Sequence, residues 1–405
     1  MLHLIFLILI TSFIAEFILD YLNIKNWSTV PEMLRDVYSE EKYDKARAYA
    51  QTNYRFSQWS ALFSLIILSV ALLTGLFGTL DQWIRQWTDS PVLVAMGFFF
   101  ILGFASDILS LPFSLYKTFV IEEKFGFNKT TPKTFVLDKI KGYLVAIVLG
   151  GAIIAILVRA YEMTGENFWW IAWLFLSVLM LLMTMFYTSV LLPLFNKLTP
   201  LPEGELRSAI EEYSRKNDFP LQNIYVMDGS KRSSKANAFF SGLGKKKKIV
   251  LFDTLIAQHT TDELVAVLAH ETGHYKMKHT RTSLLAALLQ TGIMFFVFSL
   301  LQGNPALYES LNAKSPGLHL ELLTFGLLYS PVSAITGIQM HIVSRKHEYE
   351  ADAFAKETYD GQALAHALKK LSAENLSNLT PHPAYVFVHY SHPTLLSRLR
   401  ALQAV

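Results

Sequence analysis

The sequence predicts a mainly α-helical polytopic membrane protein with two polar segments outside the bilayer. Apolar residues make up 52% of the 405 residues and charged residues only 17%, whereas about a quarter of the residues in an ordinary soluble domain are charged. Stretches of about 17–25 apolar residues are long enough to cross a bilayer as helices. The chain contains seven such stretches, at 2–20, 59–79, 92–116, 143–160, 168–193, 283–302 and 322–343.

These stretches divide the chain into four parts. Residues 1–195 hold the first five spans, and residues 283–343 hold the last two. The polar segments are 196–282 and 344–405. Because two spans separate them, both polar segments should lie on the same side of the membrane. We therefore expect them to meet and to form one unit.

The basic residues of the short loops predict which side that is. The first and third loops are rich in lysine and arginine, whereas the second holds only Arg85 and the sixth only Lys314. Cytoplasmic loops carry the excess of basic residues, so the N-terminus is expected outside and both polar segments in the cytoplasm. The first stretch has neither a basic n-region nor an Ala-x-Ala-like cleavage site. It is therefore expected to be a retained anchor, with a cleaved signal peptide as the alternative.

Composition also restricts the partners and the metal chemistry. The net charge of +3 is too small to indicate a nucleic acid as the partner. The chain has no cysteine, which excludes disulfides and thiolate ligands. A zinc site in this protein would have to use histidine and carboxylate side chains.

The segment His270-Glu271-Thr272-Gly273-His274 has the spacing of a zinc hydrolase motif. Residues i and i+4 share one face of a helix, so both imidazoles can reach one metal ion. Glu271 is rotated by about 100° from His270, which lets it reach a water at the metal. Two neutral imidazoles, an open position for water and a nearby carboxylate are what a zinc hydrolase requires.

The flanking residues predict how this helix begins and packs. Residues 250–282 read as a strand, a turn and a helix. Thr260 and Glu263 have the spacing of a capping box at the helix start. Gly273 costs roughly 1 kcal/mol relative to alanine inside a helix, so we expect another element to approach closely there.

A third zinc ligand is expected from the second polar segment. Residues 344–355 read as a helical continuation of the last span, in which Glu348 and Asp352 share a face. Glu348 would complete a His, His, Glu site, and Asp352 would bond to the outer nitrogen of one ligand histidine. The alternative is an ordinary surface helix with ion pairs to Arg345 and Lys346.

The residues before the motif read as a β-hairpin. One strand runs through Lys235 to Phe240, a glycine- and lysine-rich turn follows, and Ile249 to Phe252 form the second strand. The strand at Asn237 could be an exposed edge to which an extended peptide adds as a further strand.

Polar residues within the spans allow two interpretations. Asp107 lies in the third span, and the seventh carries several, including Ser330, Thr336 and His341. They could satisfy a few interhelical hydrogen bonds. Alternatively, they could line a hydrated chamber beneath the polar unit.

The chain resembles the type I CAAX prenyl endopeptidases, which are integral-membrane zinc metalloproteases of the gluzincin type. The resemblance covers nearly the whole chain. It rests on the seven spans and on Glu122 to Lys129, Asn237-Ala238-Phe239, His270 to His274, Glu348 to Asp352, and Ser391-His392-Pro393 with Arg398.

The resemblance implies a function for most of these motifs. It implies a zinc-dependent endopeptidase that binds one zinc ion through His270, His274 and Glu348. Glu271 would be the general base. The remaining implied roles are support of a ligand by Asp352, binding of the substrate backbone at Asn237 and Ala238, and lining of the catalytic cleft by His392 and Arg398.

The resemblance also implies a fold and a setting. In this family seven helices form a ring around a large chamber, which an α+β protease domain with a small sheet caps. Here 196–282 and 344–405 would be the two parts of that domain. The compact outer loops are similar to those of bacterial members, so a bacterial inner membrane is the expected location. The expected partners are the bilayer and a peptide or protein substrate, lipidated or membrane-associated.

Three other functions can be compared with this one. A heat-shock quality-control zinc protease would have fewer spans and no counterpart of the third-loop motif, Glu122 to Lys129. A site-2-type protease would place its histidine pair inside an apolar span. A transporter or binding protein with a structural zinc would use four protein ligands and would not need Glu271.

Overall fold

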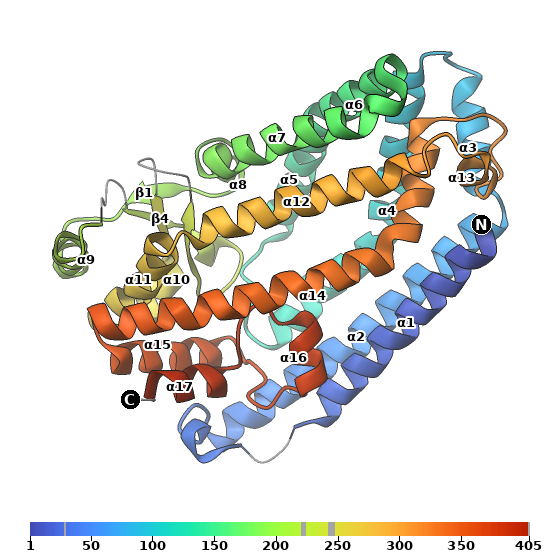
Figure 1. The fold of residues 1–405 in the computed structure, drawn as a ribbon. Helices are drawn as coiled ribbons and strands as arrows, with labels where there is room; N and C mark the ends of the chain where they lie inside the picture. Colours follow the sequence, from blue (N-terminus) through green and yellow to red (C-terminus); the bar gives the residue numbers. More distant parts are fainter. Residues whose placement is uncertain (28–29, 220–223, 242–247, 404–405) are drawn as a thin grey trace.

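The computed structural model describes residues 1–27, 30–219, 224–241 and 248–403. Long helices run side by side through most of the molecule, and a small sheet with several shorter helices gathers at one end (Figure 1). The long helices are α1 (Leu2–Lys25), α2 (Glu40–Leu73), α4 (Pro91–Tyr116), α5 (Pro132–Val145), α6 (Gly151–Thr164), α7 (Phe168–Val190), α12 (His279–Ser299) and α14 (Leu318–Thr358). The predicted mainly helical membrane protein is confirmed.

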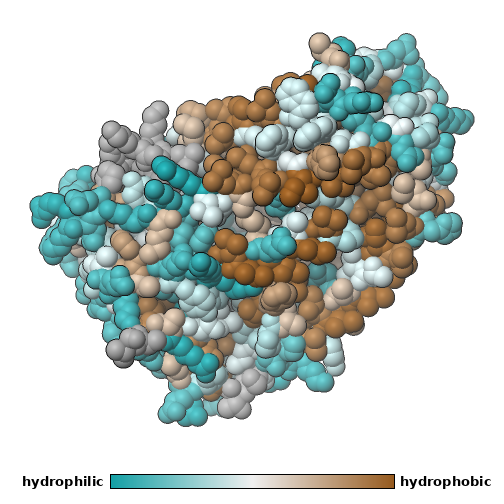
Figure 2. All heavy atoms as spheres, in the orientation of Figure 1, coloured by the Kyte–Doolittle hydropathy of each residue, from teal (hydrophilic) through white to brown (hydrophobic). Residues whose placement is uncertain are grey.

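The outer faces of the long helices are apolar. Leu7, Val148 and Leu285 have exposed fractions of 59%, 66% and 67%. Figure 2 shows hydrophobic residues covering the long helices, with hydrophilic surfaces at both ends. Large apolar side chains exposed in this way are stable only when lipid covers them.

Within the described ranges, six helical stretches are long and apolar enough to cross a membrane. One of them, Pro132–Phe195, contains two of the seven expected spans. It reverses direction at Gly165, whose φ is 52°, and α6 and α7 then lie side by side (Figure 1). The count of seven spans, and the ring around a chamber, stay predictions.

Two expected element boundaries are wrong. The predicted span 59–79 is interrupted, because α2 ends at Leu73 and Gly75 adopts a left-handed φ of 67° before α3 (Leu76–Arg85) begins. The turn expected after residue 252 is a short helix, α10 (Asp253–Gln258). Local sequence patterns revealed neither the break at Gly75 nor the short helix α10.

The small sheet has the strand order β1-β2-β4-β3. β1 (Leu198–Pro200) pairs antiparallel with β2 (Ile224–Met227), β2 pairs parallel with β4 (Lys248–Phe252), and β4 pairs antiparallel with β3 (Ala238–Ser241). The predicted pairing of the last two strands is confirmed. The turn that joins them, with Lys245, lies outside the described residues.

Both polar segments contribute to one hydrophobic core. α9 (Glu205–Lys216), α11 (Thr261–Lys276), α15 (Gly361–Glu374) and α17 (Leu395–Gln403) surround it, together with the third loop. Its buried members include Phe125, Ile210, Leu268, Leu364 and Leu399. The remaining α-helices of the described residues are the short α8 (Leu192–Phe195), α13 (Pro305–Glu309) and α16 (Pro383–His389).

Candidate metal centre and substrate cleft

Helix α11 carries the motif and is fixed at its start and along its length. The Glu263 amide donates to Thr260 Oγ1 over 3.3 Å, and the Thr260 amide donates to the Glu263 carboxylate over 2.9 Å. The predicted capping box is therefore confirmed.

The close approach expected at Gly273 is also confirmed. A Cβ atom there would lie 2.9 Å from Ala351 Cα and 3.1 Å from Phe354 Cβ. Only glycine lets α14 come this near to α11. Helix α14 continues from the last expected span through Glu348, as predicted.

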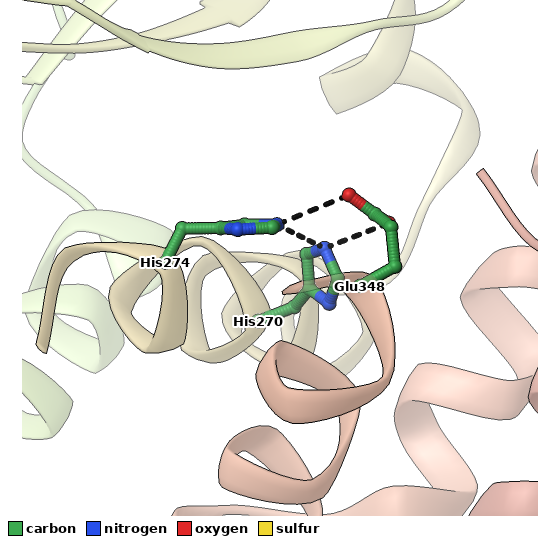
Figure 3. A group of neighbouring side chains, drawn as sticks. All are labelled: His270, His274 and Glu348. Carbon is green, nitrogen blue, oxygen red and sulfur yellow. Dashed lines mark hydrogen bonds and ion pairs between the residues drawn. The ribbon is translucent and has the colours of Figure 1, made fainter. Parts of the chain in front are cut away.

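His270, His274 and Glu348 converge at the crossing of α11 and α14 (Figure 3). The two histidine Nε2 atoms are 3.2 Å apart. Glu348 Oε1 lies 3.2 Å from His274 Nε2, and Glu348 Oε2 lies 3.5 Å from His270 Nε2. Tetrahedral ligands at about 2.1 Å from a zinc ion are roughly 3.4 Å from one another, so these three groups fit one metal ion.

The surroundings of Glu348 also fit a cation. Its Oε2 atom is buried and accepts no hydrogen bond from the part of the chain that the structure describes. Arg398 Nη1 lies 3.3 Å from that atom but donates no hydrogen bond to it, so an acceptor position remains unused. A buried carboxylate oxygen with an unused acceptor position costs free energy unless a positive group binds it.

The outer face of His270 is held by a buried ion pair. His270 Nδ1 lies 2.8 Å from Asp352 Oδ1, and Arg398 donates to both Asp352 oxygens over 2.8 and 2.5 Å. Burial lowers the pKa of the His270 imidazole, but Asp352 and Glu348 outweigh burial and raise it to about 9. The two carboxylates thus favour the protonated imidazole, and a metal ion bound to His270 competes with that proton.

A cavity of about 180 Å³ adjoins the three converging side chains. Its lining includes Glu271, His392 and Arg398, together with Asn237 and Ala238. Burial raises the pKa of the Glu271 carboxyl, which strengthens it as a proton acceptor.

His392 and Arg398 occupy different parts of this cavity. The His392 side chain is 62% exposed, and its Nε2 lies 3.4 Å from Glu348 Oε1. Arg398 is buried beneath, with only 8% of its surface exposed. Asn237 precedes β3 rather than belonging to it, and its carbonyl accepts a hydrogen bond from the Phe252 amide over 3.1 Å. β3 is an edge strand of the described sheet, so its outer side can pair with a further strand.

Sequence reasoning missed an apolar wall of the cavity. Helix α15 contributes Leu364, Ala367, Leu368 and Leu371 to it. Their spacing of i, i+3, i+4 and i+7 is the signal of an apolar helix face, but the sequence does not show which cavity that face would line.

The third-loop motif holds residues 232–235, the segment that leads to the cavity, through hydrogen bonds and a ring contact. The Ser234 amide donates to the Phe127 carbonyl over 3.1 Å, and the Lys129 amide donates to the Arg232 carbonyl over 3.0 Å. Lys235 Nζ donates to Tyr49 OH over 2.9 Å and lies 4.3 Å from the Phe127 ring centroid. The motif thereby fixes the chain two residues before Asn237.

Comparison with known proteins places the whole chain. Residues 20–197 match the model "CAAX prenyl protease N-terminal, five membrane helices", and residues 200–405 match the model of peptidase family M48. The chain belongs to peptidase family M48. As a member it is a multi-pass membrane metalloendopeptidase that acts on peptide or protein substrates, and the alternative of a transporter with a structural metal is not favoured.

Individual relatives agree with this family assignment. "CAAX prenyl protease 1 homolog" of Arabidopsis thaliana is 36% identical over 97% of this chain and 95% of its own length. "CAAX prenyl protease 1" of Saccharomyces cerevisiae is 35% identical over 93% and 89%. The crystal structure of S. mikatae Ste24p superposes with a TM-score of 0.94 at 35% identity, covering 99% of this chain and 98% of that one.

Proposed function

We propose that this protein is a zinc endopeptidase that cleaves prenylated CAAX-type proteins at the membrane surface. The observation that carries the proposal is the convergence of His270, His274 and Glu348 beside a cavity that also contains Glu271 and ends at a sheet edge. The names of the relatives supply the substrate class.

His270, His274 and Glu348 would hold one zinc ion, with Asp352 bonding to the outer nitrogen of His270. Zinc bound there would supply Lewis acidity, which acidifies water and polarises a peptide carbonyl. The histidine and carboxylate donors suit zinc, and the chain offers no thiolate that would favour softer metals.

Glu271 would act as the general base and then as the general acid. Its carboxylate takes a proton from the attacking water while a C–O bond forms at the substrate carbonyl. It then gives that proton to the leaving amine nitrogen as the C–N bond breaks. One water is consumed, and Glu271 returns to its starting state.

The substrate would lie along the sheet edge. Its backbone would add to β3 beside Asn237 and Ala238, and one apolar side chain would enter the cavity against α15. Arg398 would hold Asp352 and Glu348 in place, and His392 would face the substrate from the cavity mouth.

The catalytic unit would consist of residues 196–282 and 344–405, joined by the two helices that 283–343 contribute. The distribution of basic loops supports a cytoplasmic position for this unit and an outer position for the N-terminus. The expected bacterial inner membrane rests on the compact outer loops alone, and the relatives reported above are eukaryotic.

The decisive test is Glu271→Gln in the purified, detergent-solubilised protein. We expect unchanged zinc content and thermal unfolding but no cleavage of a farnesylated CAAX peptide, because the amide cannot accept the proton. The same peptide without the farnesyl group tests the substrate class, and slower cleavage is expected. Normal turnover by Glu271→Gln would refute the proposed mechanism.

A further inference from the structure

The two histidines proposed to hold zinc differ in what binds their outer nitrogens. A zinc-bound imidazole keeps one N–H, and a fixed acceptor for that N–H sets the orientation of the ring. For His270 the acceptor is Asp352. For His274 it is another histidine: His274 Nδ1 lies 2.9 Å from His279 Nδ1.

His279 is held in place by its own partners. It is the first residue of α12 and follows Lys278, whose left-handed φ of 61° turns the chain between α11 and α12. Only 5% of its surface is exposed. Its Nε2 atom lies 2.9 Å from Glu350 Oε2, so a chain of contacts runs from His274 through His279 to a carboxylate.

Only one arrangement of protons satisfies this chain of contacts once His274 binds a metal through Nε2. His274 Nδ1 then carries hydrogen and donates it, so His279 Nδ1 must accept. A neutral imidazole carries its hydrogen on the other nitrogen, so His279 Nε2 donates to the Glu350 carboxylate. Every donor in the chain therefore faces an acceptor.

His279, His347 and Glu350 also form a second group of potential metal ligands. The ring geometry argues against a shared metal ion. The His279 and His347 rings are stacked, with centroids 4.0 Å apart and planes inclined by 10°. Imidazole lone pairs lie in the ring plane, so two stacked rings cannot both direct lone pairs at one ion between them.

We infer that His279 and Glu350 are positioning residues that fix the orientation of His274 for zinc binding. This inference rests on the proposed zinc site. Helix α14 then contributes two residues to the site. Glu348 enters the site directly, and Glu350, two residues later, acts through His279.

The experiment measures zinc affinity of the full chain in detergent by competition with a chelator. His279→Leu removes the acceptor, and we expect zinc to bind about 10–100-fold more weakly. His279→Asn places an amide oxygen near the former Nδ1 position, so it should recover most of the affinity. Glu350→Gln should weaken binding less than His279→Leu, because the amide oxygen still accepts.

A matched control and a second readout separate positioning from general destabilisation. Lys346 is also an ion-pair partner of Glu350, at 3.7 Å, and its side chain is 76% exposed. Lys346→Ala should bind zinc like the wild type. The visible absorption of the Co²⁺-substituted protein should change in His279→Leu and be restored in His279→Asn. If His279→Leu does not fold, the zinc affinities of Glu350→Gln and Lys346→Ala are compared instead. We expect Glu350→Gln to bind zinc more weakly than Lys346→Ala.

Three outcomes would overturn the inference. Unchanged zinc affinity and an unchanged Co²⁺ spectrum in His279→Leu would do so. Failure of His279→Asn to recover affinity would show that the acceptor is not what matters. Two zinc ions per wild-type chain, reduced to one by His347→Ala, would show that the second group is itself a metal site. A wild-type chain that binds no zinc would instead refute the proposed function.

Discussion

The metal side and the substrate side of the cleft are built differently. On the metal side, buried charged groups from α11, α14 and α17 bond to one another at 2.5–2.8 Å around Asp352. On the substrate side, an edge strand and the exposed His392 face the cavity. Under the proposed function, this difference fits a metal side that keeps a fixed geometry and a substrate side that binds an extended peptide through its backbone.

The largest effect is expected at the buried ion pair. Asp352→Asn should weaken zinc binding by about 10–100-fold, because the amide holds His270 less firmly and leaves Arg398 without its full counter-charge. Chelator competition checks this prediction. Glu357 lies on the same helix and is exposed, so Glu357→Gln is the matched control. Equal zinc retention by Asp352→Asn and Glu357→Gln would show that the buried ion pair does not fix the metal site. It would thereby contradict the contrast between the metal side and the substrate side.

The next effect concerns the contact that brings the two helices together. Gly273→Ala forces a methyl group against Ala351 and should destabilise the fold by about 1–3 kcal/mol, with loss of zinc at lower temperature. A Cβ atom added at Gly326, within α14, would meet no heavy atom of the described residues within 4 Å. Gly326→Ala should therefore leave the unfolding temperature unchanged or slightly raised. Equal melting of the two variants would contradict the close approach.

The smallest effect is expected on the substrate side. Lys235→Met removes the contacts to Tyr49 and Glu122 that hold the segment before β3. We expect KM to rise about fivefold with kcat nearly unchanged, which corresponds to about 1 kcal/mol of binding. Steady-state kinetics measure this split. Lys231→Met, at an exposed lysine of the same segment, is the control. A fall in kcat alone would mean that the contacts of Lys235 affect the metal side rather than substrate binding.

Sequence reasoning could predict what depends on local spacing. The capping box at Thr260, the close approach at Gly273 and the shared face of Glu348 and Asp352 all follow from helical periodicity, and the structure contains each of them. These patterns are local, so one sequence is enough to recognise them.

The remaining features depend on contacts between distant segments. The break at Gly75, which packs against Asn312, and the α15 wall of the cavity arise from packing of elements far apart in sequence, whereas the contact between His274 and His279 depends on the turn between α11 and α12. A histidine five residues beyond the motif has the wrong spacing for a metal ligand, and nothing local shows that it meets the outer face of one.

The central claim is that segments on either side of two membrane helices share one zinc ion. Zinc content per chain, measured on the wild type, Glu271→Gln and Glu348→Gln after dialysis against chelator, tests it most directly. We predict one zinc in the wild type and in Glu271→Gln, and marked loss in Glu348→Gln. Full zinc content together with wild-type cleavage in Glu348→Gln would contradict the claim.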